Sequence, residues 1–72
     1  MNPKRIKLRK DEDFITLGVM LKMAGLISTG GQAKFFLMDN DVFINNEIDV
    51  RRGRKLYRGD IIAVGNELFL IE

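Results

Sequence analysis

The 72-residue sequence contains no cysteine, no histidine and no tryptophan, and it has only one proline. Without cysteine, no disulfide can compensate for the small core that so short a chain buries. Cysteine is a common nucleophile, histidine is the usual proton shuttle, and both are common metal ligands. Without them, a metal site would have to consist of carboxylates alone. The acids are scattered singly except for Asp11, Glu12 and Asp13, which we interpret as a solvated segment before the first helix. Nothing in the sequence requires a buried carboxylate pair or a nucleophilic lysine. We therefore expect no enzyme, no metal site and no cofactor.

Long apolar runs are absent as well. No stretch approaches the ~20 apolar residues that a membrane span requires, and the charged N-terminus lacks the apolar segment of a signal peptide. We therefore expect a protein without a membrane partner, located in the reducing cytoplasm. With 46% hydrophobic residues, the chain can form one small globular domain, which we expect to be a monomer.

The net charge of +2 hides a separation of charges along the chain. Ten of the twelve cations lie in two blocks without acids, and all ten acids lie outside these blocks. The blocks consist of Lys4, Arg5, Lys7, Arg9 and Lys10, and of Arg51, Arg52, Arg54, Lys55 and Arg58. They would create a positive face if they folded near each other. The alternative is two solvated charge runs, the first of them a terminal tail.

Apolar residues at helical spacing predict two helices in the first half of the chain. Thr16 can cap the first helix, and Gly25 can end it. The apolar stripe between them consists of Leu17, Met20, Leu21 and Ala24. A second helix, capped by Ser28 or Thr29, would end at Asn40, where a left-handed asparagine would let the chain turn. Its apolar face consists of Ala33, Phe36 and Leu37.

Short segments rich in β-branched and aromatic residues predict strands in the second half, at "VFIN", "IDV", "IIAV" and "LFLI". We expect an α+β fold in which two N-terminal helices pack on a small, twisted antiparallel sheet of about four short strands. Residues 1–13 would be a basic N-terminal tail, in which Ile6 and Leu8 alternate with cations as in an edge strand. Residues 14–72 would form the domain itself.

A set of residues spread over both helices and the strands carries a family pattern. They are Leu17, Leu21, Ala24, Gly25, Leu26, Ser28, Ala33, Leu37, Val42, Ile44 and Asn45, followed by Gly59, Asp60 and Ile61. This pattern resembles the alpha-L RNA-binding domain, named after small-subunit ribosomal protein S four, and is most similar to its short stand-alone bacterial members. The resemblance covers about residues 14–72. It implies non-catalytic binding of structured RNA, namely ribosomal RNA or a ribosomal precursor, with a role on the ribosome or in its assembly.

The resemblance also implies which residues meet the RNA. In the family, the second helix begins with a Ser-Arg element and carries another cation after an alanine. Here Gly30 occupies the arginine position and Lys34 the second, while two polar positions of the first helix align with Thr16 and Gly18. The second basic block would supply the missing phosphate contacts, because arginine can bind a phosphate through two hydrogen bonds. The candidate RNA-binding residues are Lys22, Thr29, Gly30, Gly31, Gln32, Lys34, Arg51, Arg52, Arg54, Lys55 and Arg58.

Two features of the sequence, one inside this candidate set and one outside it, allow more than one interpretation. Gly30 and Gly31 would open backbone amides to an anion at the start of the second helix, but a flexible turn explains them equally well. Phe35 and Tyr57 are the aromatic residues best suited to base stacking, but packing within the protein is the favoured interpretation for each.

Two other functions fit a basic face. One is a protein-interaction adaptor that binds an acidic partner, which binding resistant to ribonuclease would identify. The other is binding to an anionic membrane, but the sequence lacks the amphipathic helix with exposed aromatic residues that this requires. A small-molecule substrate is not expected.

Overall fold

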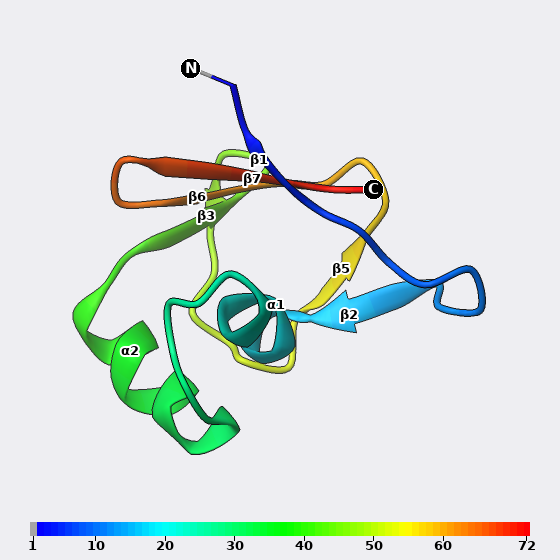
Figure 1. The fold of residues 1–72 in the computed structure, drawn as a ribbon. Coiled ribbons are helices and arrows are strands. Elements are labelled where there is room, and N and C mark those ends of the chain that lie inside the picture. The colour runs from blue at the N-terminus through cyan, green and yellow to red at the C-terminus, as the bar shows by residue number, and fades with distance from the viewer. Residues whose placement is uncertain (1) are drawn as a thin grey trace.

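A computed structural model describes residues 2–72. Within this range the chain forms two α-helices, one 3-10 turn and seven strands (Figure 1). In chain order they are β1 (Lys4–Ile6), β2 (Phe14–Thr16), α1 (Leu17–Met23), η1 (Gly30–Gln32), α2 (Ala33–Asp39), β3 (Val42–Ile44), β4 (Glu47–Ile48), β5 (Lys55–Tyr57), β6 (Ile61–Val64) and β7 (Glu67–Ile71).

The predicted sheet of about four antiparallel strands behind two N-terminal helices is wrong. Five strands form one mixed sheet in the order β1-β7-β6-β3-β4, and β2 and β5 form a separate two-stranded ribbon. The sheet is mixed because β1 runs parallel to β7, whereas all other neighbouring strands of this sheet pair antiparallel. Two strands precede α1, so the helices are not both N-terminal.

Strand β1 lies at an edge of the sheet and takes up part of the segment predicted as a basic tail. Of that segment, residues 1–13, the first residue lies outside the described range. Ile6 and Leu8 are buried, and the chain continues alongside β7: Glu72 N–H donates to Ile6 O at 2.9 Å, and Leu8 N–H donates to Glu72 O at 2.8 Å. The alternation of apolar residues and cations therefore puts one face of this segment against the core.

Helix α1 begins and ends where the sequence predicted. Thr16 Oγ1 accepts a hydrogen bond from Val19 N–H at 3.4 Å, which satisfies one free amide of the first turn. At the other end Gly25 has a φ of +77°, and its N–H donates to Lys22 O at 3.1 Å. Leu26 N–H reaches back to Leu21 O at 3.0 Å, which completes a Schellman motif. The helix is thus fixed at both ends by local contacts.

Helix α2 also lies within its predicted range, but its end differs from the expectation. Asn40 has φ −133° and ψ 133°, which is extended backbone and not the left-handed conformation expected there. Its side-chain amide Nδ2 donates to Phe36 O at 2.9 Å and so caps a free carbonyl of the last turn. The left-handed asparagines come later, at Asn45 and Asn46, in the tight turn between β3 and β4.

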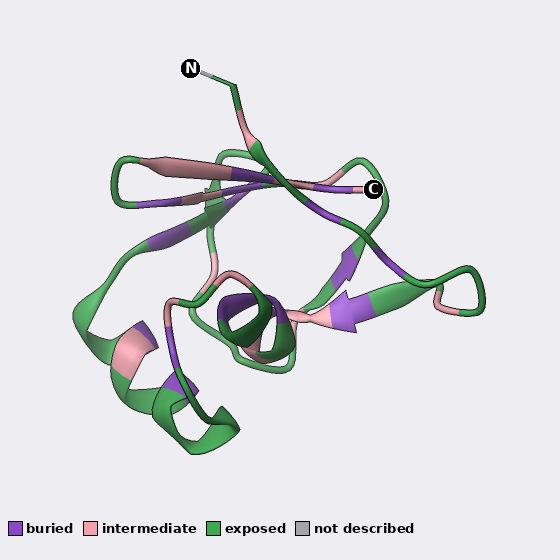
Figure 2. Cartoon of the chain, in the orientation of Figure 1, coloured by how far each residue is buried: buried purple, intermediate pink, exposed green. Residues whose placement is uncertain are grey.

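The core joins the sheet, α1 and the β2–β5 ribbon. In Figure 1, α1 lies below the sheet, with the ribbon on one side of it and α2 on the other. Figure 2 shows buried residues on all of these elements. The most deeply buried side chains are Phe69, Leu17, Met20, Leu21, Ile44, Leu56, Ile62, Ile71 and Val42. Among residues 2–72 no polar or charged residue is buried as a whole, although the side chain of Asp49 is largely covered.

Neither described helix has the length and apolar character needed to cross a membrane.

Candidate nucleic-acid interface

The second basic block lies in a loop that folds against the start of α1. We call residues 49–54, between β4 and β5, the basic loop. Leu17 N–H donates to Arg54 O at 2.8 Å, and Gly18 N–H donates to Arg52 O at 2.9 Å. Within the loop, Arg54 N–H donates to Arg51 O at 3.1 Å and closes a turn. The loop carbonyls therefore satisfy the first amides of α1, which would otherwise be free to meet an anion.

Gly18 permits this close approach. A Cβ atom at position 18 would lie 3.4 Å from Arg52 O, 3.6 Å from Arg52 Cβ and 3.7 Å from Ala33 Cβ. A methyl group would be in van der Waals contact on these sides, and a longer side chain would have to displace the loop. Gly18, which aligns with a polar position of the alpha-L family, thus lets the basic loop lie against α1.

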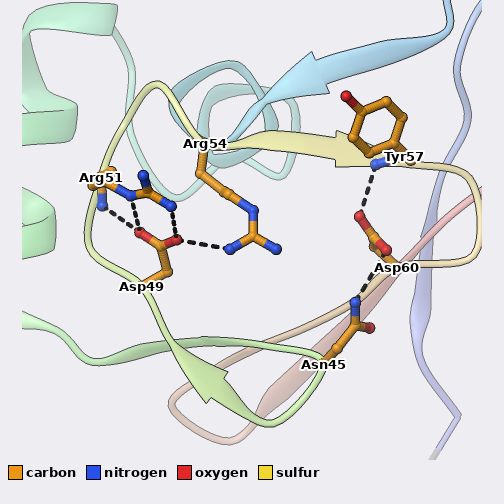
Figure 3. Close-up of polar contacts among 6 residues, drawn as sticks. All are labelled: Asn45, Asp49, Arg51, Arg54, Tyr57 and Asp60. Atoms are coloured by element: carbon orange, nitrogen blue, oxygen red, sulfur yellow. Dashed lines mark hydrogen bonds and ion pairs between the residues drawn. The ribbon is translucent and has the colours of Figure 1, made fainter.

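Asp49 anchors the basic loop through two of its arginines (Figure 3). Its side chain is only 8% exposed. It accepts hydrogen bonds from Arg51 Nε at 3.1 Å and Nη2 at 2.8 Å, from Arg51 N–H at 3.0 Å, and from Arg54 Nη1 at 2.8 Å. The bonds from Arg51 hold the pKa of Asp49 far below its ordinary value, with a smaller contribution from Arg54 and against the opposing effect of burial. Two predicted phosphate-binding residues are therefore already engaged within the protein.

Arg58 also makes contacts within the protein, because it connects the two basic blocks. Its guanidinium donates to Glu12 O at 2.8 Å and to Arg9 O at 2.9 Å, which ties the turn after β1 to the end of β5. The turn that follows is fixed as well. Gly59 has a φ of +96°, and Asp60 accepts from Tyr57 N–H at 2.8 Å (Figure 3). We conclude that Arg58 stabilises the contact between the turn after β1 and the end of β5.

Within the described residues, four of the predicted cations besides Arg58 are exposed and take part in no ion pair: Lys22, Lys34, Arg52 and Lys55. Lys22 lies in the last turn of α1 and shares no surface hollow with the others. Three cations, Lys34, Arg52 and Lys55, therefore remain available around the basic loop. They come from α2, the basic loop and β5, and the ion pairs of Asp49 fix the loop that carries Arg52. Because an unpaired surface cation keeps its full charge for a ligand, these three are the strongest candidates for contact with an anion.

The three available cations line hollows that adjoin one another. Lys34 and Arg52 border the first, whose apolar walls are Leu37, Met38 and Val50. Arg52 also borders a second hollow with Gly18, Gly30 and Gly53. Gly53 in turn borders a third with Arg51, Arg54, Lys55 and Tyr57. Consecutive hollows share Arg52 and then Gly53, so they lie next to one another. We call these three adjoining hollows together the basic furrow, defined by Lys34, Arg52, Gly53, Lys55 and Tyr57.

The predicted residues just before α2, residues 29–32, have different roles, and Gly30 alone among them lines a hollow of the furrow. Gln32 Oε1 accepts hydrogen bonds from Ser28 N–H at 2.6 Å and Thr29 N–H at 3.1 Å, so its carbonyl group caps the 3-10 turn. Gly30 and Gly31 are exposed, with no atom within 4 Å of the position that a Cβ would take. Gly30 borders the furrow. Lys22 is exposed in the last turn of α1 and lines none of the three hollows.

The charge separation along the sequence is partly cancelled in space. Glu67 and Glu72 lie in and just after β7, beside β1. They pair with Lys4 at 2.9 Å and with Arg5 at 3.0 Å. Arg9 pairs with Glu12 at 3.4 Å. Such exposed pairs add little stability, but they reduce the positive potential of the first block. The pairs of Lys4 and Arg5 could not be predicted from the sequence, because they form only when β1 pairs with β7 in the fold.

Within residues 2–72 no cluster of three or more side chains could hold a metal ion. Two acids belong to this region: Asp41 borders the first hollow, and Asp49, in the basic loop, pairs with two arginines.

Comparison with known proteins establishes the family of the chain. The sequence pattern of the S4 domain matches residues 6–72. The chain belongs to the S4 domain family. The match includes both helices, the basic loop and the β2–β5 ribbon, and confirms the resemblance seen in the sequence. This S4 domain is also 52% identical over 54 residues to the probable ribosome maturation protein RlbA of Bacillus subtilis (strain 168). That alignment covers 75% of this chain and 76% of the relative.

Proposed function

We propose that this S4 domain binds structured RNA without catalysing a reaction, and that the RNA is ribosomal RNA or a ribosomal precursor during maturation of the ribosome. The observation that carries the proposal is the basic furrow, in which Lys34, Arg52 and Lys55 have no ion pair with any described residue. Membership of the S4 domain family supports RNA as the ligand, and the name of the Bacillus relative supports the ribosomal role.

The furrow suits a nucleic-acid backbone because its cations are held on different elements that are locked together. Arg52 lies on a loop that is fixed by Asp49 and by the first amides of α1. Little conformational entropy is therefore lost when the loop meets its ligand, and this favours binding. In the proposed complex, Arg52, Lys34 and Lys55 each meet a phosphate, and Gly30 and Gly53 let the RNA backbone approach the protein closely.

Recognition would rest mainly on the shape of the RNA. The deep major groove of an A-form helix hides base edges from side chains, so folded RNA is read through phosphates, 2′-hydroxyls and unpaired bases. The remaining predicted residues divide into two groups in this proposal. Arg51, Arg54, Arg58 and Gln32 support the surface, whereas Lys22, Thr29 and Gly31 would lie at its margin. The protein would act as a monomer in the cytoplasm.

The proposal is tested by binding of the purified chain to refolded fragments of bacterial ribosomal RNA. We expect saturable binding to at least one fragment, and loss of most of it in Arg52→Glu. Lys7→Glu makes the same charge change at an exposed cation outside the furrow and should bind nearly as the native chain does. Binding of a cellular partner that persists after ribonuclease, with no affinity for any RNA fragment, would contradict the proposal and favour an adaptor.

A further inference from the structure

The exposed face of the β2–β5 ribbon carries two aromatic rings and a cation in contact with one another. Phe14 and Tyr57 are paired across the two strands, and their ring centroids lie 5.9 Å apart at an interplanar angle of 50°. Lys55 Nζ lies 4.9 Å from the centroid of the Phe14 ring, within the range of a cation–π interaction. These three side chains form what we call the aromatic platform.

The platform faces away from the core. Leu56, between Lys55 and Tyr57, is fully buried, so alternation along β5 places its two neighbours on the outer face of the ribbon. Phe14 is 38% exposed and Tyr57 is 49% exposed. Rings that served only to fill the core would be buried, as Phe69 is at 1%. The packing of Phe14 against Tyr57 therefore orients the rings and still leaves aromatic surface open.

The backbone under the platform is held firmly. Tyr57 N–H donates to Asp60 Oδ2 at 2.8 Å, and Asp60 N–H donates back to Tyr57 O at 3.0 Å. Asn45 Nδ2 donates to Asp60 Oδ1 at 3.0 Å and connects this turn to the end of β3. Figure 3 shows the Tyr57 ring turned away from Asp60. The ring is thus presented on a rigid element, which lowers the entropic cost of stacking a ligand on it.

The platform lies at one end of the basic furrow, since Lys55 and Tyr57 line the third hollow together with Arg51 and Arg54. Phosphates bound at Lys34, Arg52 and Lys55 in turn would bring the RNA to the hollow that the Tyr57 side chain lines. Aromatic rings beside a cationic groove are the arrangement by which proteins bind unpaired nucleotides, because every base has a π-face.

We propose that the aromatic platform is a stacking site for one unpaired base of the bound RNA. The base stacks on Tyr57, Phe14 positions the Tyr57 ring, and Lys55 meets the phosphate of the same nucleotide. The site rests on the proposed RNA-binding function and adds to it a requirement for a flipped-out or single-stranded nucleotide next to the structured part. The alternative ligand of the aromatic platform is an apolar side chain of a protein partner, and the experiment must distinguish it from a base.

The sequence offers a direct spectroscopic test, because it contains one tyrosine and no tryptophan. Tyrosine fluorescence therefore reports on Tyr57 alone. The probes are a short single-stranded oligoadenylate, an abasic oligomer with the same number of phosphates, and the ribosomal RNA fragment that binds best. We expect oligoadenylate and the fragment to quench the emission of the native chain, and the abasic oligomer to bind without quenching it.

Substitutions at Tyr57 then separate stacking from charge. Tyr57→Leu should weaken binding of oligoadenylate by about tenfold, because stacking one base contributes ~1–3 kcal/mol, and should leave abasic binding unchanged. Tyr57→Phe should retain the affinity. Phe35→Leu is the matched control, since Phe35 is 65% exposed on α2, outside the platform. If Tyr57→Leu fails to fold, the fluorescence quenching of the native chain still shows whether a base stacks on Tyr57.

Two results have distinct meanings. If the RNA fragment binds with a strong salt dependence but neither it nor oligoadenylate quenches Tyr57, the platform proposal is overturned and the proposed function stands. If no RNA binds at all, both fail together.

Discussion

Asp49 and Arg51 are joined by three hydrogen bonds, one from the Arg51 backbone amide and two from its guanidinium. The acid lies just outside the basic block and also accepts a hydrogen bond from Arg54. These contacts explain how the loop can carry several cations so close together. Two of the arginines hold the loop in place through Asp49, and Arg52 remains available on the surface that they create.

The first prediction concerns the stability that Asp49 provides. Asp49→Asn removes the charge from both ion pairs and should lower the free energy of unfolding at neutral pH by about 2 kcal/mol, as expected for hydrogen bonds to a charged group. Urea unfolding measured by circular dichroism gives this value. Asp11→Asn, at an exposed acid in a turn, should change it little. An equal loss in both variants would show that Asp49 has no special role.

The stability difference between the native chain and Asp49→Asn should depend on pH, and the sign of this dependence can be stated. The fold lowers the pKa of Asp49 below its ordinary value of 3.8. Its contribution is therefore complete above that value and is lost as the pH falls through the lower pKa of the folded state. The native chain should lose its advantage over Asp49→Asn in this acid range. A difference that stays constant down to the lowest pH at which the chain folds would mean that the effect is not due to the carboxylate charge.

Gly18 gives a prediction about the contact between α1 and the basic loop. Gly18→Ala should fold at least as stably as the native chain, since alanine favours a helix over glycine by ~0.5–1 kcal/mol and its Cβ would be at contact distance. Gly18→Leu should displace the loop at a cost of ~1–3 kcal/mol and weaken RNA binding. Thermal unfolding and RNA titration test both. A leucine variant that binds and melts as the alanine variant does would contradict the account.

Gly30 and Gly31 allow a test of the surface beside the furrow. Both positions are open to solvent, so a glutamate at either should change the melting temperature by only a few degrees. Gly30→Glu places a negative charge beside Arg52 and should weaken RNA binding more than Gly31→Glu does. Binding is measured by fluorescence anisotropy of a labelled ribosomal RNA fragment. A loss of folding in step with the loss of binding would make these glycines structural.

Local signals were sufficient to predict the helices and the strand segment at "VFIN" that forms β3. Thr16 and Gly25 bracket one apolar stripe, and their capping contacts lie within a few residues in the sequence. Asn46 adopts a positive φ in the turn between β3 and β4, as expected for this residue type. Each of these features depends on neighbours along the chain, and periodicity or turn chemistry can reveal it.

The missed features all depend on distant pairings. Strand β2 has only three residues, too few to show a period, and the partners of β1 and β2, which are β7 and β5, lie far along the chain. Phe14 meets Tyr57 only because of that second pairing, so it could not be chosen as part of a site. The cations of the second block looked equivalent in the sequence, and only the fold separates those bound by Asp49 from those left free.

The dependence of RNA affinity on salt tests the central claim most directly, namely that the free cations of the furrow neutralise phosphates. The double variant Lys34→Ala and Arg52→Ala is compared with Lys7→Ala and Lys10→Ala, which removes the same charge outside the furrow. Each phosphate contact contributes ~0.7–0.9 to the slope of log K against log salt. We predict that the furrow variant flattens the slope by about 1.5 units and that the control leaves it nearly unchanged. Equal slopes in both variants, with both chains folded by circular dichroism, would contradict the account.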